Sequence, residues 1–184
     1  KNIKLLQGKP LIQYSIDVAK SVSSINEVFV STDDTEIAEI SESLGATVII
    51  RPEVLATDRS PEWLSWCHAI EWVRKNRGEF EYFLSLPATS PLRIAEDIES
   101  ALLKISTSNS DICIGVTPSS RSPFFNMVIK KHGTLKIVMN DQGIISRRQD
   151  APDVYDVTTV VYASTPHFIL NNTGIFSGKV TSID

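Results

Sequence analysis

The chain has 184 residues, of which 42% are hydrophobic and 22% charged, and it carries a formal net charge of −4. A chain of this length can bury about two thirds of its unfolded surface in one core, so a single domain is expected. The acidic balance, with a pI near 5.4, excludes long-range attraction to a polyanion and argues against nucleic acid or an acidic membrane surface as a partner. Any phosphate-binding site must therefore be local.

The first 116 residues alternate helices and strands with short connections. Apolar residues at helical spacing predict helices at 11–21, 36–44, 62–76 and 95–106. Runs of apolar and β-prone residues predict strands at 27–31, 47–50, 82–86 and 111–116. Such alternation is typical of right-handed crossovers between neighbouring strands, so it favours a parallel sheet.

The pattern changes between residues 117 and 156. Prolines and glycines there separate short β-prone pieces, at 126–129 and 135–139, and the basic pair Arg147–Arg148 follows. An excursion of this kind inside a compact domain is usually functional or an oligomer contact. Adjacent arginines usually lie on a solvated surface, but one of them, placed before a returning strand, could reach an anion across a cleft.

Beyond the excursion we expect a strand at 157–162, a short helix at 167–171 and a last strand at 179–183.

Polar turns follow two of the expected strands. The strand at 82–86 ends in Thr89-Ser90-Pro91-Leu92-Arg93, where a hydroxyl pair and a guanidinium could meet phosphate or sugar oxygens. Open α/β sheets bind ligands beyond the carboxyl ends of their strands, although this segment alone is only a strand with a polar stop. At Ser31–Asp34, capping of the next helix by Asp34 or Thr35 is favoured over a metal role, because capping needs no ligand.

Single basic residues are less specific. Arg51 follows the strand at 47–50 and can fork onto phosphate or ribose oxygens, but an exposed ion pair with Glu53 or Asp58 explains it equally well. Lys1 and Lys9 lie before the first helix, where a triphosphate could sit, and an isolated lysine there is more often simply solvated. These residues support a phosphate-binding site only in combination with the other motifs of the chain.

Other residue classes argue against common site types. The three histidines, at 68, 132 and 167, have no Ser or Asp partner at a suggestive position, so a catalytic triad is not indicated. No Gly-x-Gly-x-x-Gly or Walker-type loop is present, which weakens dinucleotide and P-loop interpretations. The tryptophans at 63, 66 and 72 share one helical segment, where packing or a dimer surface is favoured over base stacking.

The two cysteines, Cys67 and Cys113, lack a metal-binding or redox spacing, so buried thiols in a reducing cytoplasm are favoured over a disulfide. No apolar run approaches the roughly 18 residues of a membrane helix, and no signal-peptide pattern opens the chain. We therefore expect a cytoplasmic protein without a membrane partner. The chain begins at Lys1 without an initiator Met and stops at Asp184 without a closing helix, so we also expect truncation at both ends.

Six segments, in order and with matching spacing over nearly the whole chain, resemble the acylneuraminate cytidylyltransferase family, the CMP-sialic acid synthetases. They are 1–3, 8–12, 30–34, 51–58, 89–93 and 147–152. The resemblance implies an α/β fold similar to nucleotide-diphospho-sugar transferases, a three-layer sandwich with a mostly parallel sheet. It implies one nucleotidyltransferase domain over 1–184, in which 117–156 forms a small β-rich arm for dimerisation.

The resemblance also implies an activity: a nucleotidyltransferase that joins CTP to a 2-keto-3-deoxy sugar acid, releases pyrophosphate, uses Mg²⁺ and forms a homodimer. By this similarity the catalytic residues are Lys1, which with Asn2 belongs to the signature that holds the nucleotide phosphates, and Arg148, which approaches the sugar or phosphate. The substrate-binding residues implied are Asn2, Arg51, Thr89, Ser90, Pro91, Arg93, Gln149 and Thr158. No metal ligand can be assigned.

The chain departs from the family pattern in places that bear on the acceptor. Relatives usually carry a basic glycine-rich loop before the Lys-Asn pair and an Asp-x-Asp near the C-terminus, and neither lies in this chain. Many relatives have Gln-Pro where this chain has Pro87-Ala88 and Asn-Gly where it has Thr158-Thr159. These positions resemble sugar-contacting ones, so the keto acid stays open. Two alternatives also stay open: a nucleotidyltransferase of the same fold with another acceptor, and a catalytically silent nucleotide-binding or dimer-scaffold domain.

Overall fold

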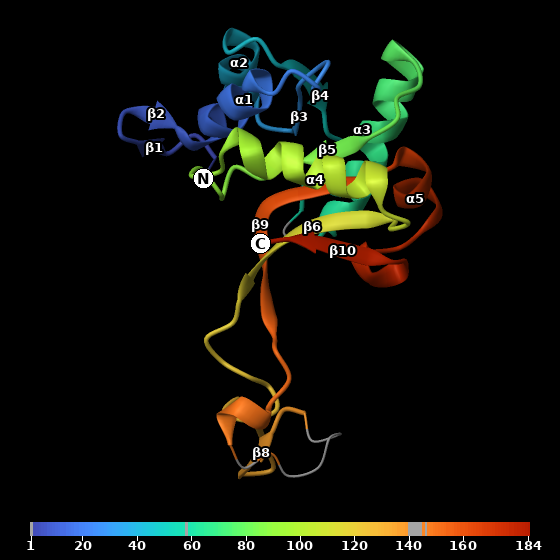
Figure 1. The fold of residues 1–184 in the computed structure, drawn as a ribbon. Coiled ribbons are helices and arrows are strands. Elements are labelled where there is room, and N and C mark those ends of the chain that lie inside the picture. The colour runs from blue at the N-terminus through green and yellow to red at the C-terminus, as the bar shows by residue number, and fades with distance from the viewer. Residues whose placement is uncertain (1, 58, 140–144, 146) are drawn as a thin grey trace. The chain divides into compact units, whose positions relative to one another are not determined.

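The computed structural model of the chain describes residues 2–57, 59–139, 145 and 147–184, and Figure 1 labels its elements. The helices are α1 (Leu11–Ser21), α2 (Thr35–Ser43), α3 (Glu62–Arg77), α4 (Ala95–Thr107) and α5 (Pro166–Asn171), with 3-10 turns η1 (Glu53–Leu55), η2 (Arg148–Asp150) and η3 (Ile175–Ser177). The strands are β1 (Leu5–Leu6), β2 (Lys9–Pro10), β3 (Phe29–Thr32), β4 (Thr47–Ile50), β5 (Phe83–Ser85), β6 (Ile112–Pro118), β7 (Val128–Lys131), β8 (Thr134–Ile137), β9 (Tyr155–Ser164) and β10 (Val180–Ile183). They belong to two compact units, here named the α/β unit (1–115 and 159–183) and the excursion unit (116–158 and 184).

The expected helices are confirmed to within one residue at each end. Local chemistry explains this agreement, as α2 shows. The Asp34 carboxylate accepts a hydrogen bond from the Ile37 backbone N–H at 3.0 Å, so the predicted cap is confirmed. The helix stops before Gly45, whose φ of +77° lies in the left-handed region that glycine occupies at little cost.

The prediction of a mostly parallel sheet is wrong, because the main sheet is mixed. It has four strands in the order β10-β6-β9-β5, with β10 parallel to β6 but β5 antiparallel to β9. β3 and β4 pair in parallel as a separate two-stranded sheet. A parallel neighbour requires a crossover connection, usually a helix on the sheet, whereas β9 follows the excursion unit and is free to enter in the opposite direction.

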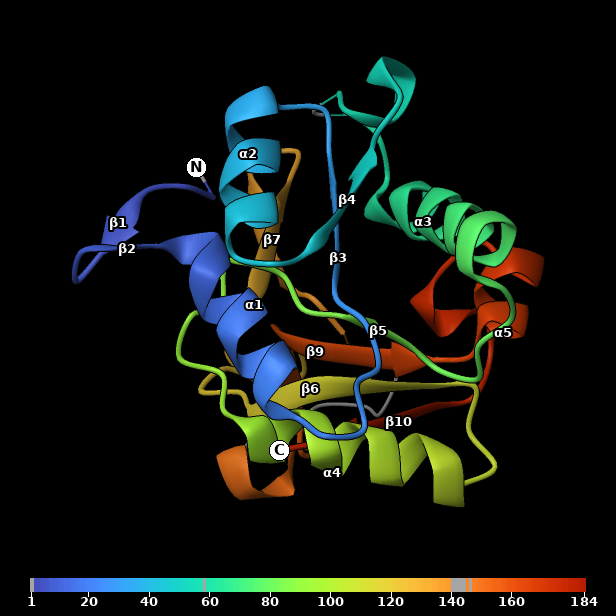
Figure 2. The same cartoon turned by 90° about the horizontal axis from the view of Figure 1, so that it is seen from above.

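Helices cover both faces of the main sheet. Val161 and Ala163 on β9 pack into one cluster with Ala101 and Ile105 of α4. Tyr162, between them on the strand, meets Trp66 of α3 with ring centroids 5.2 Å apart. Because successive strand residues point to opposite faces, α4 and α3 lie on opposite sides of the sheet, which gives three layers. Figure 2 shows α4 beside β10 and α2 beside β3 and β4.

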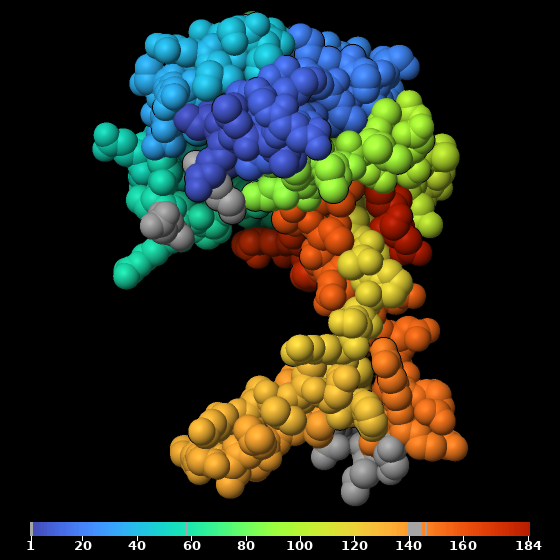
Figure 3. Space-filling model, turned by 90° about the vertical axis from the view of Figure 1, so that its left-hand side faces the viewer, coloured from blue at the N-terminus to red at the C-terminus, as the bar shows by residue number. Residues whose placement is uncertain are grey.

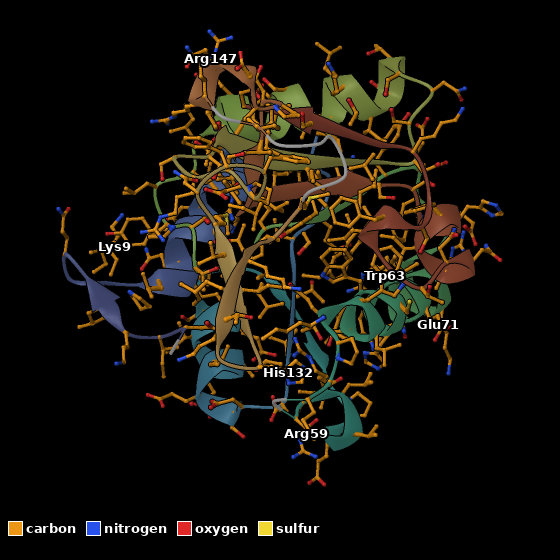
Figure 4. The ribbon with its side chains drawn as sticks, turned by 90° about the horizontal axis from the view of Figure 1, so that it is seen from below. Lys9, Arg59, Trp63, Glu71, His132 and Arg147 are labelled. Atoms are coloured by element: carbon orange, nitrogen blue, oxygen red, sulfur yellow. The ribbon has the colours of Figure 1, made fainter. Side chains whose placement is uncertain are left out.

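The tryptophans of α3 serve packing, as expected from the sequence. Trp63 and Trp66 are 8% and 6% exposed. Trp63 lies edge-on to Phe168 of α5 at 5.9 Å, and its indole N–H donates to the Asn172 carbonyl at 3.0 Å. Figure 4 labels Trp63 on α3, next to α5. This pair of helices therefore closes one side of the α/β unit.

The excursion unit contains a hairpin of β7 and β8, paired antiparallel with Val128 opposite Ile137. His132 and Gly133 form its turn with φ values of 48° and 80°, as a tight two-residue hairpin requires. Every residue of β7 is exposed. Figure 3 shows the atoms of this segment, in the yellow to orange part of the scale, on the surface of their unit. The assignment of this unit to dimerisation stays a prediction.

Both cysteines are free, Cys113 buried and Cys67 half-buried. Burial raises the pKa of the Cys113 thiol to about 11 and also raises the pKa of Cys67, where the charge of Glu71 adds to the effect. Both thiols are therefore protonated at neutral pH. Within the residues that the structure describes, none of the helices combines the length and apolar character needed to cross a bilayer.

Candidate active site

Three hydroxyl groups meet at the turn that follows β5. The Thr159 hydroxyl lies 3.1 Å from that of Thr89 and 2.7 Å from that of Ser90. The turn is closed by main-chain hydrogen bonds from the Ser90 N–H to the Pro87 carbonyl and from the Arg93 N–H to the Ser90 carbonyl. We name these three side chains, Thr89, Ser90 and Thr159, the hydroxyl cluster. It joins the predicted turn to the antiparallel neighbour β9.

Arg93 lies beneath this cluster and is only 6% exposed. Its guanidinium donates to the Ser15 hydroxyl at 2.9 Å, to the Pro87 carbonyl at 2.9 Å, to the Thr159 carbonyl at 3.0 Å and to the Val160 carbonyl. Burial lowers the pKa of Arg93 to about 10, with the charge of Asp97 opposing the shift, so the group remains charged at neutral pH. The direct substrate contact predicted for Arg93 would require these bonds to be exchanged.

Arg51 links the ends of the parallel strands β3 and β4. Its Nε donates to the Ser31 hydroxyl at 3.1 Å, and Nη2 donates to the Ser31 carbonyl at 2.6 Å. Of the two ion pairs considered for it, the one with Glu53 is not formed within the described part of the chain, and Asp58 lies outside the described residues. Arg51 therefore sits at a strand end, as predicted, and its partly exposed guanidinium is oriented by Ser31.

At the start of the chain, Asn2 is described and Lys1 lies outside the described residues. The Asn2 carbonyl accepts a hydrogen bond from the Ile12 N–H at 2.8 Å, and the Lys4 carbonyl accepts one from the Leu11 N–H at 3.0 Å. These bonds satisfy two of the free N–H groups in the first turn of α1. The segment that carries the predicted phosphate signature is thereby held against the start of that helix.

Arg148 borders a cavity within the excursion unit. The cavity has a volume of about 160 Å³ and is lined by Pro118–Ser122, Phe125, Asn126, Arg148 and Ala151–Tyr155. Arg148 donates to the Ser120 carbonyl at 3.4 Å, while its neighbour Arg147 is bound to Asp150 through two hydrogen bonds of 2.7 and 2.9 Å. Of the two arginines, Arg148 therefore has the weaker contact with the protein, and it lines the cavity.

The predicted site residues are divided between the two units. Asn2, Arg51, Thr89, Ser90, Pro91 and Arg93 belong to the α/β unit, whereas Arg148, Gln149 and Thr158 belong to the excursion unit. Gln149 is exposed on η2, and Thr158 is half-buried on β9. The convergence of both groups on one cleft stays a prediction.

Comparison with known proteins gives the family. A family model described as cytidylyltransferase matches residues 1–176. The chain belongs to the cytidylyltransferase family. The resemblance read from the six sequence segments is thereby confirmed, and so is the expectation that the chain is an enzyme of the nucleotidyltransferase class.

Relatives of this cytidylyltransferase align over nearly the whole chain. Flagellin modification protein B of Campylobacter coli is 30% identical over 185 residues, which cover 100% of this chain and 77% of the relative. The CMP-N,N′-diacetyllegionaminic acid synthase of Campylobacter jejuni shows the same identity and coverage. The Legionella pneumophila protein of that name is 31% identical over 96% of this chain and 76% of its own length.

Solved structures support the fold. A CMP:2-keto-3-deoxy-manno-octonic acid synthetase matches with a TM-score of 0.65 at 18% identity, over 93% of this chain and 69% of its own. The 4-diphosphocytidyl-2C-methyl-D-erythritol synthase of Anaerococcus prevotii matches with a TM-score of 0.64 at 14% identity, over 97% and 78%. At such identities the likeness concerns the fold of the cytidylyltransferase alone.

Two residues of this cytidylyltransferase were left out of the predicted site: Arg121 was not considered, and Thr159 was named only as a position that resembles a sugar-contacting one. Thr159 completes the hydroxyl cluster, and Arg121 lines the cavity beside Arg148. The replacement of Asn-Gly by two threonines at 158–159 marked this position, but the contact of Thr159 with Thr89 and Ser90 was not predicted. Arg121 stands in a run of serines without any spacing that marks a site.

The residues that the structure describes include no group of three or more His, Cys, Asp or Glu side chains that could hold a metal ion. Divalent magnesium prefers oxygen ligands, with one or two carboxylates and substrate phosphates commonly supplying them. A magnesium site of one or two carboxylates would be completed by the substrate, and Mg²⁺ stays an expectation.

Proposed function

We propose that this chain transfers the cytidylyl group of CTP to a 2-keto-3-deoxy sugar acid of the sialic acid type. The observation that carries the proposal is the family match over residues 1–176, together with relatives named for such acids. Besides the legionaminic acid synthases, these relatives include an N-acylneuraminate cytidylyltransferase of Escherichia coli and a pseudaminic acid cytidylyltransferase of Campylobacter jejuni.

In the proposed reaction the anomeric hydroxyl oxygen of the acid forms a bond to the α-phosphorus of CTP. The bond from that phosphorus to the β-phosphate oxygen breaks, pyrophosphate leaves with the electron pair, and the hydroxyl proton is released. Such a displacement needs positioning and neutralisation of developing negative charge more than covalent catalysis. This requirement is consistent with a site built from arginines and hydroxyls.

We assign the roles accordingly. The free donors of Arg51 face a nucleotide oxygen, and Arg148 neutralises charge on the phosphate or the acid, while Lys1 and Asn2 hold the nucleotide phosphates. Thr89, Ser90 and Pro91 form the turn that lines the acceptor site, with Gln149 and Thr158 supplying further polar contacts. Magnesium, where bound, would supply additional charge neutralisation at the phosphates.

We also infer that the active form is a homodimer assembled through the excursion unit. The support is the exposure of apolar side chains on its hairpin, including Leu135 at 66% and Val128 at 52%. Exposed apolar side chains that are covered by a partner are a common feature of interaction sites in soluble proteins. The cytoplasm is the expected compartment, since both thiols are free.

Calorimetry and a product assay on the full-length gene product test the function. CTP with MgCl₂ is titrated first, and pyrophosphate release is then followed with N-acetylneuraminic, N,N′-diacetyllegionaminic, pseudaminic and 3-deoxy-octulosonic acids. We expect CTP binding and turnover of at least one nine-carbon acid, with UTP and GTP inactive. Preference for another nucleotide, or turnover only of an acceptor outside this class, would replace the proposal with a different nucleotidyltransferase. Failure to bind any nucleotide would favour the silent scaffold.

A further inference from the structure

We propose that Arg93 is a positioning residue, whose buried guanidinium holds the hydroxyl cluster in the arrangement that recognises the hydroxyl groups of the acceptor. The proposal rests on the proposed cytidylyl transfer to a sugar acid. It assigns to Arg93 an indirect role in place of the contact with substrate expected from the sequence. It also gives a structural reason for placing Thr159 at the acceptor site, since its hydroxyl meets those of Thr89 and Ser90.

The first argument is the geometry of the guanidinium. Its acceptors come from three parts of the chain: Ser15 on α1, Pro87 before the turn, and Thr159 and Val160 on β9. The Ser15 hydroxyl itself lies 3.5 Å from the Pro87 carbonyl, so the same group connects two of these parts. Arginine suits this task because its planar donors have fixed directions and can meet several acceptors at once.

The second argument is energetic. Taking a charged guanidinium out of water is costly, and the lowered pKa of Arg93, about 10, reflects that cost. An apolar side chain at the same position would fill the space without the penalty. A buried charge whose donors reach backbone carbonyls on both sides of a turn is therefore better explained by the shape it imposes than by stability alone.

The third argument concerns the hydroxyl cluster, whose main chain is held by Arg93. Nη2 donates to two carbonyls, that of Pro87, which precedes the turn, and that of Thr159, a member of the hydroxyl cluster. The Thr89 and Thr159 side chains are exposed, so their hydroxyls face solvent while the main chain beneath them is fixed. Hydroxyls that can both donate and accept match the hydroxyls of a sugar acid, whereas a triphosphate would call for cations. The cluster therefore suits the acceptor better than the phosphates of CTP, and the separate KM values for the two substrates test this assignment.

The test separates KM for the acceptor from KM for CTP in four variants of the full-length protein, using an acid that the wild type turns over. Arg93→Met keeps an unbranched apolar side chain and removes the guanidinium donors, and we expect the acceptor KM to rise at least tenfold while the CTP KM changes less than twofold. Arg93→Lys, with one compact ammonium in place of the fork, should recover part of that loss. Thr159→Val should raise the acceptor KM at least threefold, and Thr159→Ser should stay near wild type.

Arg77→Met provides the matched control. Arg77 donates to Glu27 at 3.2 Å and stacks on Trp72, so its loss removes a structural arginine of the α/β unit without touching the cluster. This variant should keep both KM values. Should Arg93→Met fail to fold, Ser15→Ala removes one of its acceptors and Thr159→Val alters only an exposed group, and both must still raise the acceptor KM selectively.

The outcomes distinguish this proposal from the function on which it rests. A wild type without acceptor turnover removes both. An active wild type whose folded Arg93→Met or Thr159→Val variants keep the wild-type acceptor KM removes the positioning role alone. Equal losses for both substrates in Arg93→Met, with no recovery in Arg93→Lys, would likewise assign Arg93 to general stability.

Discussion

The two units of the chain differ in what they bury. The α/β unit encloses Ile70, Ile98 and Ile112 at 0% exposure between helices and sheet. In the described part of the excursion unit the one buried residue is Ser122, while Leu135 and other apolar side chains are open to solvent. The first unit therefore has a core of its own, whereas the described residues of the second leave most of their apolar side chains exposed.

The difference in burial suggests different roles for the α/β unit and the excursion unit. A packed core holds loops in fixed positions, which suits the hydroxyl cluster and the guanidinium beneath it. A unit without a core is held by its turns and hairpin, and it gains apolar burial only through contact. The predicted site residues fall in both units, so the role of Arg148 and the role of the hydroxyl cluster can be tested separately.

The largest effect should come from opening the core of the α/β unit. Ile98→Ala removes a fully buried side chain from α4, and we expect unfolding free energy to fall by about 2–5 kcal/mol because a cavity is left. Urea titration followed by tryptophan fluorescence measures it. Leu103→Ala, on the same helix but 64% exposed, is the control and should cost less than about 0.5 kcal/mol. Similar losses for both would deny that the unit has a distinct core.

In the excursion unit we expect substitution of Arg148 to lower the turnover of the enzyme. Arg148→Ala should reduce kcat/KM at least tenfold, because losing a charge-assisted contact costs about 1.5–3 kcal/mol. Arg147→Ala is the matched control, since Arg147 is paired with Asp150 at the surface and should keep activity within about twofold. Steady-state kinetics with CTP and the acceptor decide between them. Unchanged kinetics for Arg148→Ala would remove this residue from the site.

The features that could be predicted from the sequence were those that depend on neighbouring residues in the chain. Helix ends followed from Asp34 and Gly45, and the packing of Trp63 and Trp66 followed from their shared helical face. The short hairpin of β1 and β2 was missed. Its strands have only two residues each, too few to show a pattern, and the positive φ values of Gln7 and Gly8 in its turn are visible only in the structure.

Features that depend on distant partners were not predictable. The antiparallel entry of β9 is set by the path of the excursion, which no periodicity in residues 155–164 records. The sequence placed Arg93 in a polar turn and so favoured a ligand contact, but its burial depends on Ser15 and Val160, which lie far away along the chain. The contact of Thr159 with the turn at Thr89 and Ser90 was not predicted for the same reason.

A smaller effect is expected at the cap of α2, which tests how far the α/β unit relies on local chemistry. Asp34→Ala removes the acceptor for the Ile37 N–H and should lower unfolding free energy by about 1 kcal/mol. Asp33→Ala changes a neighbouring exposed carboxylate that does not cap the helix and should change stability by less than about 0.5 kcal/mol. Chemical denaturation of both variants provides the measurement, and equal losses would indicate a general charge effect.

The smallest effect on a single chain should come from the hairpin of the excursion unit. Leu135→Ala removes a side chain that is already 66% exposed, so unfolding free energy measured at low protein concentration should fall by less than about 0.5 kcal/mol. Sedimentation at rising concentration should nevertheless show a dimer dissociation constant increased several-fold, because apolar area covered by the second chain is lost. Leu103→Ala, equally exposed on the α/β unit, should leave association unchanged.

The two measurements together decide what the apolar residues of the excursion unit are for. Weakened association with intact single-chain stability means that the core missing from this unit is completed by another copy of the chain. A loss above about 2 kcal/mol at low concentration would instead mean that Leu135 is buried within its own chain in solution. Unaltered association and stability would mean that the hairpin is not the dimer contact, and the contrast between the units would then concern folding alone.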